Sequence, residues 1–235
     1  MAHYGLVEAG GTKFVLGIAD AGGALAATHR IPTTTPGETL GAAVGWFHEQ
    51  GLMPAAIGIA SFGPLDLDRA SPHWGHIART PKPHWTDTDL AGPFVRSFGC
   101  PVGIETDVNG AALAEARWGA GVGQGSLLYL TIGTGVGGGF VSGGRLLHGL
   151  SHPEMGHIRL PRHRDDRDFA GNCPFHGDCL EGLASGPAVS ARWGASLSSL
   201  GGDHPGNAMI AWYLGQALCT FQAIMEPARI VLGGG

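Results

Sequence analysis

Apolar and polar residues alternate in short runs along the first thirty residues, and clusters of turn residues separate the runs. The runs cover residues 4–9, 13–19 and 24–31, with glycine-containing turns at 10–12 and 20–23. Runs of this length, joined by tight turns, predict an antiparallel meander of three strands.

A similar pattern returns in the second half of the chain. A hydrophobic run at 126–132 is followed by a glycine-rich segment at 133–139, an apolar pair at 140–141, a turn at 142–144 and a further run at 145–147. Both copies read as strand, glycine turn containing Gly-Thr, strand, turn and strand. The recurrence predicts two structurally similar halves that face each other, each presenting a glycine hairpin to a central cleft.

The segments between and after the two copies predict helices and single strands. We expect helices over 37–50, 110–118 and 208–224, strands over 56–60, 102–105 and 229–232, an irregular proline-rich stretch over 71–93, and helices with loops after residue 180. Asp107 or Asn109 is placed to cap the alanine-rich helix 110–118. The strand before Asp107 closes the first half, so we expect one domain at 1–106 and a second at 107–235.

The composition indicates a globular chain of 235 residues, since 43% of them are hydrophobic and 14% are charged. Fourteen basic against nineteen acidic residues give a net charge of −5, which leaves no broad cationic surface for nucleic acid or an anionic membrane. No apolar run approaches the roughly 18 residues of a membrane helix, and the N-terminus lacks an export signal. We therefore expect a cytoplasmic protein. Its 42 glycines indicate tight turns and backbone brought close to a ligand.

The two glycine turns are candidate phosphate-binding loops. The spacing of Gly133, Gly135 and Gly138 matches the dinucleotide fingerprint, but a strand instead of a helix follows, which excludes a Rossmann site. A Walker A loop is excluded as well, because neither glycine cluster ends in Gly-Lys-Ser/Thr. A plain tight turn remains the alternative for either loop alone. Two matching loops favour phosphate binding by main-chain N–H groups.

Two charged residues flank the first glycine turn. Lys13 follows it directly and is a candidate phosphate contact, with a surface lysine on a strand as the alternative. Glu8 precedes it, where a carboxylate can hold a magnesium ion through water.

A group of cysteines and histidines has the spacing of a metal site. Cys173, His176 and Cys179 form a C-x2-H-x2-C pattern, and His157 lies sixteen positions earlier. Two thiolates and two imidazoles make a closed tetrahedral zinc set, so we favour structural zinc over a chance cluster and disfavour a catalytic zinc, which needs an open position. The polar stretch 162–168 between these ligands lacks apolar residues that would order it. Further histidines that are candidate ligands are His148, His152 and His163.

Asp107 is the candidate catalytic base. It stands between a strand and a helix at the proposed domain junction, and a role as helix cap is the alternative. A carboxylate between two phosphate loops can accept the proton of a hydroxyl that attacks phosphorus. Glu154, His157 and Glu181 lie beside the metal pattern, where they can hydrogen-bond several hydroxyls of a sugar.

Five motifs, in this order, resemble the ROK family of sugar kinases within the actin-like, hexokinase-like superfamily. They are Glu-Ala-Gly-Gly-Thr-Lys at 8–13, Thr-Asp-Val-Asn at 106–109, Gly-Thr-Gly-Val-Gly-Gly-Gly at 133–139, Glu-Met-Gly-His at 154–157 and Leu-Gly-Gly-Gly at 232–235. The C-x2-H-x2-C knuckle, with the segments 181–187 and 80–85, is similar to the bacterial ROK fructokinases, whereas the glucokinase branch typically has a cysteine-richer knuckle.

The resemblance implies a duplicated, ribonuclease H-like α/β fold of two domains with a zinc knuckle, and ATP-dependent phosphorylation of D-fructose at the 6-hydroxyl. It implies a homodimer, with Asp107 as the base, structural Zn²⁺ on the four cluster residues, and Mg²⁺ held through water by Glu8. The implied phosphate-binding residues are Gly10, Gly11, Thr12, Lys13, Gly133, Thr134, Gly135, Gly137 and Gly138. The implied adenosine-binding residues are Gly233, Gly234 and Gly235. The implied sugar-binding residues are Gly63, Pro64, Asp107, Glu154, His157 and Glu181.

The sequence departs from the family pattern in two places. The family continues for several dozen residues beyond the terminal glycines, so we expect a chain truncated at its C-terminus. Thr106 stands where many relatives have asparagine beside the aspartate. The alternative functions are a kinase for mannose, glucose or an N-acetylated hexosamine, a sugar-sensing ROK regulator, and a non-catalytic sugar-binding fragment.

Overall fold

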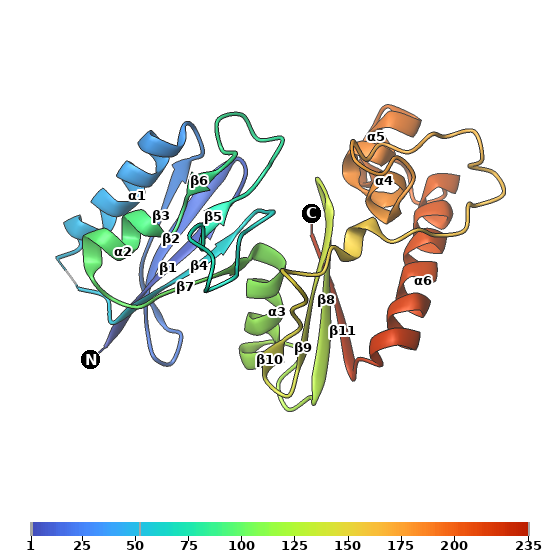
Figure 1. Ribbon diagram of the computed structural model, residues 1–235. Helices are drawn as coiled ribbons and strands as arrows, with labels where there is room; N and C mark the ends of the chain where they lie inside the picture. Colours follow the sequence, from blue (N-terminus) through green and yellow to red (C-terminus); the bar gives the residue numbers. More distant parts are fainter. Residues whose placement is uncertain (1, 52, 235) are drawn as a thin grey trace. The chain divides into compact units, whose positions relative to one another are not determined.

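Figure 1 shows the computed structural model, which describes residues 2–51 and 53–234. The chain divides into two compact units by its internal contacts. The first comprises Met1–Gly110 with His148–His152, and the second comprises Ala111–Leu147 with Pro153–Gly235. The domain limits expected from the sequence, 1–106 and 107–235, and the central cleft stay predictions.

The first unit is built on a five-stranded mixed sheet with strand order β3-β2-β1-β4-β7. Its first three strands form the predicted antiparallel meander, and β4 and β7 run parallel to β1. The bounds are β1 (His3–Ala9), β2 (Lys13–Asp20), β3 (Leu25–Pro32), β4 (Ala56–Ser61) and β7 (Val102–Thr106).

Two helices and a small two-stranded sheet complete the first core. They are α1 (Pro36–Glu49), α2 (Gly92–Phe98), β5 (His76–Ile77) and β6 (Thr88–Asp89). Thr35 and Glu38 form a capping box at the start of α1, and Phe47 of this helix packs edge-on against Phe94 and Phe98 of α2. The expectation that 71–93 is irregular is therefore wrong in part, because β5, β6 and the start of α2 fall within it.

The second unit contains a four-stranded sheet with order β10-β9-β8-β11. The strand bounds are β8 (Ser126–Ile132), β9 (Val136–Ser142), β10 (Arg145–Leu146) and β11 (Arg229–Gly233). In this sheet β8, β9 and β10 form an antiparallel meander, and β11 runs parallel to β8. The strands β3-β2-β1-β4 of the first unit have the same arrangement. The predicted duplication is therefore confirmed in the strand topology.

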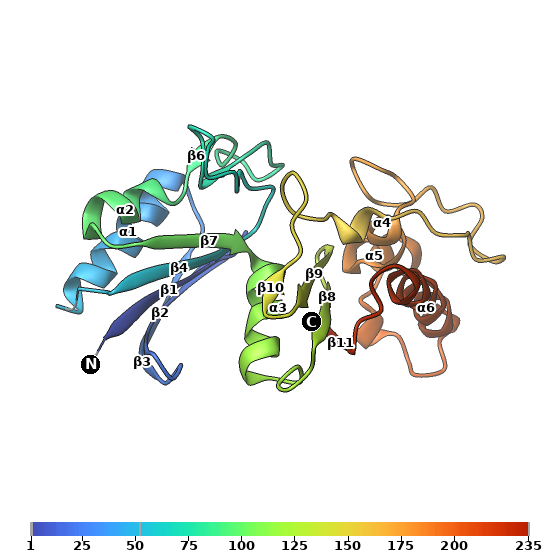
Figure 2. The same ribbon diagram turned by 60° about the horizontal axis from the view of Figure 1, so that its bottom comes forward.

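Helices cover both faces of the second sheet (Figure 2). Leu127 and Val141 pack with Ala112 of α3 on one face, while Leu128 and Leu130 face a larger core formed with α4, α5 and α6. The helix bounds are α3 (Asp107–Trp118), η1 (Met155–His157), α4 (Leu180–Ala184), α5 (Gly186–Trp193), η2 (Leu197–Ser199) and α6 (Pro205–Met225).

The helix α6 has the length and apolar composition of a membrane span, contrary to the expectation from the sequence. Core helices of soluble proteins pass the same test, and Tyr213, Ala217 and Phe221 of α6 are buried in the second core. One such helix is weak evidence for a membrane.

The helix α3 begins at Asp107, three residues before the expected start at Gly110. The hydroxyl of Thr106 accepts a hydrogen bond from the Asn109 N–H at 3.3 Å, so Thr106 fills the capping role that we expected of Asp107 or Asn109. Gly110 packs directly on Ala60 of β4, and a Cβ at Gly110 would lie 2.8 Å from the Cβ of Ala60. The glycine lets the first turn of the helix lie close to the sheet.

The run of glycines after the second turn lies inside β9, where the sequence suggested a continued turn. A Cβ at Gly138 would lie 2.7 Å from the Met155 sulfur and 2.8 Å from Leu130 Cδ2. The strand therefore needs glycine because Met155, at the start of η1, packs directly against it.

Candidate active site

The register of the first sheet brings three predicted site segments to one edge. Ala9 pairs with Ser61 across β1 and β4, and Ser61 pairs with Thr106 across β4 and β7. Because these strands are parallel, the residues that follow them emerge at the same edge of the sheet. The Gly10–Thr12 turn, the Gly63-Pro64 segment and Asp107 are therefore neighbours.

The first glycine turn is fixed from outside by one threonine. Thr33 donates its hydroxyl to the Gly10 carbonyl at 2.7 Å and its main-chain N–H to the Thr12 carbonyl at 3.0 Å. The Gly10 N–H donates a hydrogen bond to the Lys13 carbonyl. The N–H groups of Gly11 and Thr12 donate no hydrogen bond within the described part of the chain, which leaves two adjacent donors for an anion.

Asp107 lies next to a row of side chains that crosses the sheet. Glu8 pairs with Ala60, and Ala60 pairs with Glu105. The pKa of the Asp107 carboxyl is raised above its usual value. Burial is the largest cause, and the negative charge of Glu8 raises the pKa further. The Val108 N–H bond at 2.8 Å lowers the pKa, and His152 lowers it as well when its ring is protonated, but the two do not cancel this rise. A carboxylate with a raised pKa is a stronger base near neutral pH.

Two histidines join this environment, although the sequence suggested them only as spare metal ligands. His152 Nε2 accepts a weak hydrogen bond from the Leu65 N–H at 3.5 Å, beside the cis Gly63-Pro64 bond. His148 Nε2 lies 2.7 Å from Glu105 Oε1, and the other carboxylate oxygen of Glu105 accepts from Asn109 at 2.9 Å. Their distance in sequence from the rest of the first unit left no signal for this placement.

The second glycine turn is held in a comparable way. The Gly133 N–H bonds to the Gly135 carbonyl, and the Gly133 carbonyl accepts from the Gly186 N–H at 2.7 Å. The Val136 N–H donates to Glu181 Oε2 at 3.1 Å. As in the first turn, two adjacent N–H groups, those of Thr134 and Gly135, donate no hydrogen bond among the described residues.

The remaining glycines of the predicted nucleotide site lie beside this turn or beyond it. Gly137 and Gly138 lie within β9. Gly233 ends β11, which runs parallel to β8, and a Cβ at Gly234 would overlap the carbonyl of Ile132 just before the turn. Gly235 lies outside the described residues.

The four predicted zinc ligands come together in the second unit. Their ligand atoms all lie within 4.8 Å of one another. His157 Nδ1 is 3.4 Å from Cys179 Sγ and 3.8 Å from Cys173 Sγ, and His176 Nδ1 is 3.8 Å from Cys173 Sγ. Zinc bonds of about 2.3 Å to sulfur and about 2.0–2.1 Å to nitrogen place tetrahedral S and N ligands about 3.6 Å apart, so this donor set fits Zn²⁺.

The other ring nitrogen of His157 faces away from the two sulfurs. His157 Nε2 lies 3.8 Å from Glu154 Oε2. The ring can therefore hold a metal with Nδ1 while Nε2 lies on the side of Glu154.

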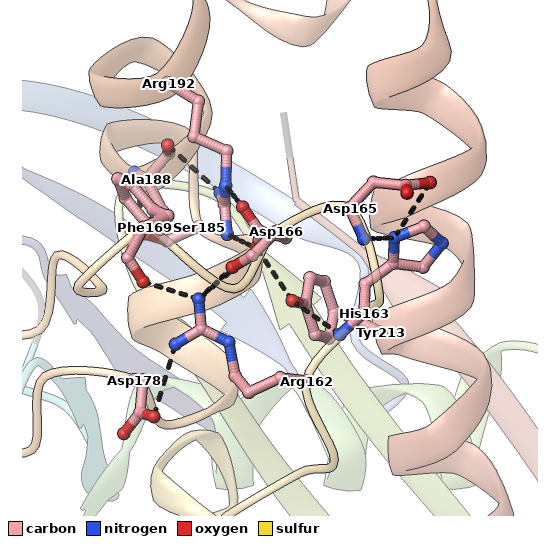
Figure 3. Close-up of polar contacts among 10 residues, drawn as sticks. All are labelled: Arg162, His163, Asp165, Asp166, Phe169, Asp178, Ser185, Ala188, Arg192 and Tyr213. Carbon is pink, nitrogen blue, oxygen red and sulfur yellow. Dashed lines mark hydrogen bonds and ion pairs between the residues drawn. The ribbon is translucent and has the colours of Figure 1, made fainter.

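The polar segment between the predicted ligands is ordered by a network of ion pairs, shown in Figure 3. Asp166 accepts two bonds from Arg192 and one from the Tyr213 hydroxyl, at 2.7 to 2.9 Å. Arg162 donates to the Asp166 and Phe169 carbonyls and also to the carboxylate of Asp178, next to Cys179. Burial disfavours the charge of Asp166, but the Arg192 and Tyr213 hydrogen bonds and the two arginine charges outweigh it and lower its pKa.

Both units contain an antiparallel meander with a further strand parallel to its first strand. In each unit a glycine turn connects the first two strands of the meander. This repeated arrangement defines a hexokinase-like α/β fold. The ROK family model matches residues 4–235. The chain therefore belongs to the ROK family.

Relatives and solved structures agree with this placement. The fructokinase of Zymomonas mobilis is 52% identical over 99% of this chain and 79% of its own length, and that of Lactococcus lactis is 43% identical over 99% and 79%. The crystal structure of the ROK hexokinase from Thermus thermophilus matches with a TM-score of 0.80 and 32% identity, covering 99% of this chain and 82% of that chain.

Proposed function

We propose that the protein is an ATP-dependent fructokinase that phosphorylates D-fructose at the 6-hydroxyl. The observation that carries this proposal is the strand register that places Asp107 at the same sheet edge as the Gly10–Thr12 turn. The identity of 52% with one fructokinase and 43% with another supports fructose as the sugar.

In the proposed reaction, Asp107 accepts the proton of the sugar 6-hydroxyl. At the same time the oxygen of that hydroxyl forms a bond to the γ-phosphorus of ATP. The bond from that phosphorus to the β–γ bridging oxygen breaks, and ADP leaves with the bond's electron pair. The free N–H groups of the turns at Gly11–Thr12 and Thr134–Gly135 bind phosphate oxygens, and Lys13 adds a positive charge. Glu8 would hold Mg²⁺ through water, and this ion neutralises phosphate charge.

For the other substrate groups, we assign residues by the family resemblance. Gly233, Gly234 and Gly235 contact the adenosine. The sugar hydroxyls are bound by Gly63, Pro64, Asp107, Glu154, His157 and Glu181. We also propose a homodimer and a cytoplasmic location, and gel filtration with light scattering tests the first of these.

We propose that the cluster of His157, Cys173, His176 and Cys179 holds a structural zinc ion. Four protein ligands leave no open position for a substrate or for an attacking water. Elemental analysis of the purified chain should find one zinc per chain. A Cys173→Ser variant should lose the zinc and unfold at a lower temperature than the wild type.

A coupled assay of ADP release with a panel of hexoses tests the function. Fructose should give the highest kcat/KM, above mannose, glucose and N-acetylmannosamine. A higher value for another hexose would identify the alternative kinase. Binding of fructose without ADP release would identify a sugar sensor or a non-catalytic fragment.

A further inference from the structure

Glu181 lies between the four-ligand cluster and the second glycine turn. Its Oε2 accepts the Val136 N–H at 3.1 Å, and a Cβ at Gly135 would lie 2.8 Å from the same oxygen. The carboxylate therefore lies against the backbone of the turn whose Thr134 and Gly135 N–H groups are free to bind an anion. A negative charge here does not attract phosphate, so toward this turn the Glu181 carboxylate serves to orient the backbone.

The start of α4, which carries Glu181, is fixed to the cluster. Cys179 is both a candidate ligand and the N-cap of α4, where its sulfur accepts the Gly182 N–H at 3.5 Å. The Gly182 carbonyl accepts from Asn172 at 2.9 Å. A Cβ at Gly182 would overlap the Gly177 carbonyl, so the helix lies directly on the knuckle loop with no room to slide.

The end of α4 is fixed to the same turn. Ser185 follows α4 and caps α5, with its hydroxyl accepting the Ala188 N–H at 3.3 Å. The next residue, Gly186, donates its N–H to the Gly133 carbonyl at 2.7 Å. The short segment after Cys179 therefore bonds the turn at two points, on either side of its free N–H groups.

We propose that Glu181 is a positioning residue through which metal occupancy of the cluster sets the affinity of the second turn for nucleotide phosphate. The inference rests on the proposed kinase function and extends it. Metal binding fixes Cys179, which fixes the first turn of α4. Glu181 then holds the Val136 N–H and leaves the N–H groups of Thr134 and Gly135 aligned for phosphate.

Calorimetric titration with Mg-ADP in the absence of sugar tests this role separately from sugar binding. Glu181→Ala removes the acceptor of the Val136 N–H and should weaken ADP binding about tenfold. Glu181→Gln keeps an acceptor oxygen and removes a negative charge, so its ADP affinity should equal or exceed that of the wild type. Glu49→Gln is the control for the loss of one carboxylate charge, because Glu49 is exposed at the end of α1 in the first unit, and it should leave ADP affinity unchanged.

Removal of the metal by a chelator provides the second arm. The metal-free wild type should lose ADP affinity to a similar extent as Glu181→Ala. Metal-free Glu181→Ala should lose little more, because the metal acts on the second turn through Glu181. Circular dichroism and zinc content check that each variant is folded. If Glu181→Ala does not fold, the metal-free wild type and Glu181→Gln still test the proposal.

Two outcomes would overturn the inference alone while the wild type still phosphorylates fructose. One is a folded Glu181→Ala protein, or a folded metal-free wild type, with the ADP affinity of the untreated wild type. The other is a metal-free Glu181→Ala protein whose loss of ADP affinity equals the sum, in free energy, of the loss from Glu181→Ala and the loss from metal removal. A metal-loaded wild type that binds no ADP would instead overturn the proposed function and the inference with it.

Discussion

The carboxylate of Asp166 forms a two-point ion pair with the guanidinium of Arg192, at 2.9 and 2.7 Å, across 26 positions of sequence. Both side chains are 5% exposed, and the Arg192 guanidinium also stacks on the Phe169 ring at 3.9 Å. A buried, fully bonded pair of this kind orders a loop that has few apolar residues. The segment that carries the candidate zinc ligands is therefore held to α5 and α6 by polar contacts.

Arg192→Met should destabilise the protein by about 3–5 kcal/mol, because it leaves the Asp166 charge buried without its main partner. Thermal or urea unfolding measures this loss. Arg164→Met is the control, since Arg164 is 84% exposed and its pair with Asp165 should contribute less than about 1 kcal/mol. Equal stabilities of the two variants would contradict the role given to the network.

Thr33→Val should raise the KM for ATP about three- to tenfold with little change in kcat, because it removes the hydroxyl bond that fixes Gly10 while preserving side-chain shape. Steady-state kinetics at saturating fructose measures the change. Thr28→Val, at an exposed position of β3, should leave the KM for ATP unchanged. A Thr33→Val enzyme with wild-type KM would show that this bond does not hold the turn for phosphate.

The acid limb of the pH profile should move in opposite directions in two variants. Glu8 raises the pKa of Asp107, so Glu8→Gln should lower that pKa and shift the limb of kcat/KM to lower pH. His152 lowers the same pKa when charged, so His152→Gln should shift the limb to higher pH. The direction of the shift is the readout, whatever the change in maximal rate. Limbs that stay in place in both variants would mean that another group controls the acid side.

The hairpins and their duplication could be predicted because their signals are local. Glycine turns between short alternating runs determine strand, turn and pairing within a few residues, and the structure places the first turn at Gly10–Thr12 and the second just before Val136. The clustering of the four candidate metal ligands was also predictable, because C-x2-H-x2-C spacing brings three of them together within one loop.

The expectations that proved wrong depend on tertiary contacts. Gly138 carries no strand signal, since its use in β9 is to make room for Met155. The early start of α3 depends on the fit of Gly110 against Ala60. Pro93 lies in the first turn of α2, where proline is typical of a helix start. The other prolines nearby in the sequence obscured this signal.

The contacts that hold the site in place were not readable from the sequence. The pairing of Asp166 with Arg192 and the approach of His152 to Leu65 join residues that are 26 and 87 positions apart. Local patterns give no information on which charged residues meet over such separations. For the same reason the sequence suggested a sugar contact for Glu181 and no contact with the Val136 N–H.

Fructose-dependent ADP release by Asp107→Asn tests the central claim most directly. The variant keeps the shape of the side chain but cannot accept the hydroxyl proton, so kcat should fall by about 10²–10⁴ while zinc content and ADP affinity stay at wild-type values. Asp203→Asn, at an exposed loop position, should retain wild-type kcat. An Asp107→Asn enzyme that turns over fructose at the wild-type rate would contradict the assignment of Asp107 as the base and the kinase mechanism built on it.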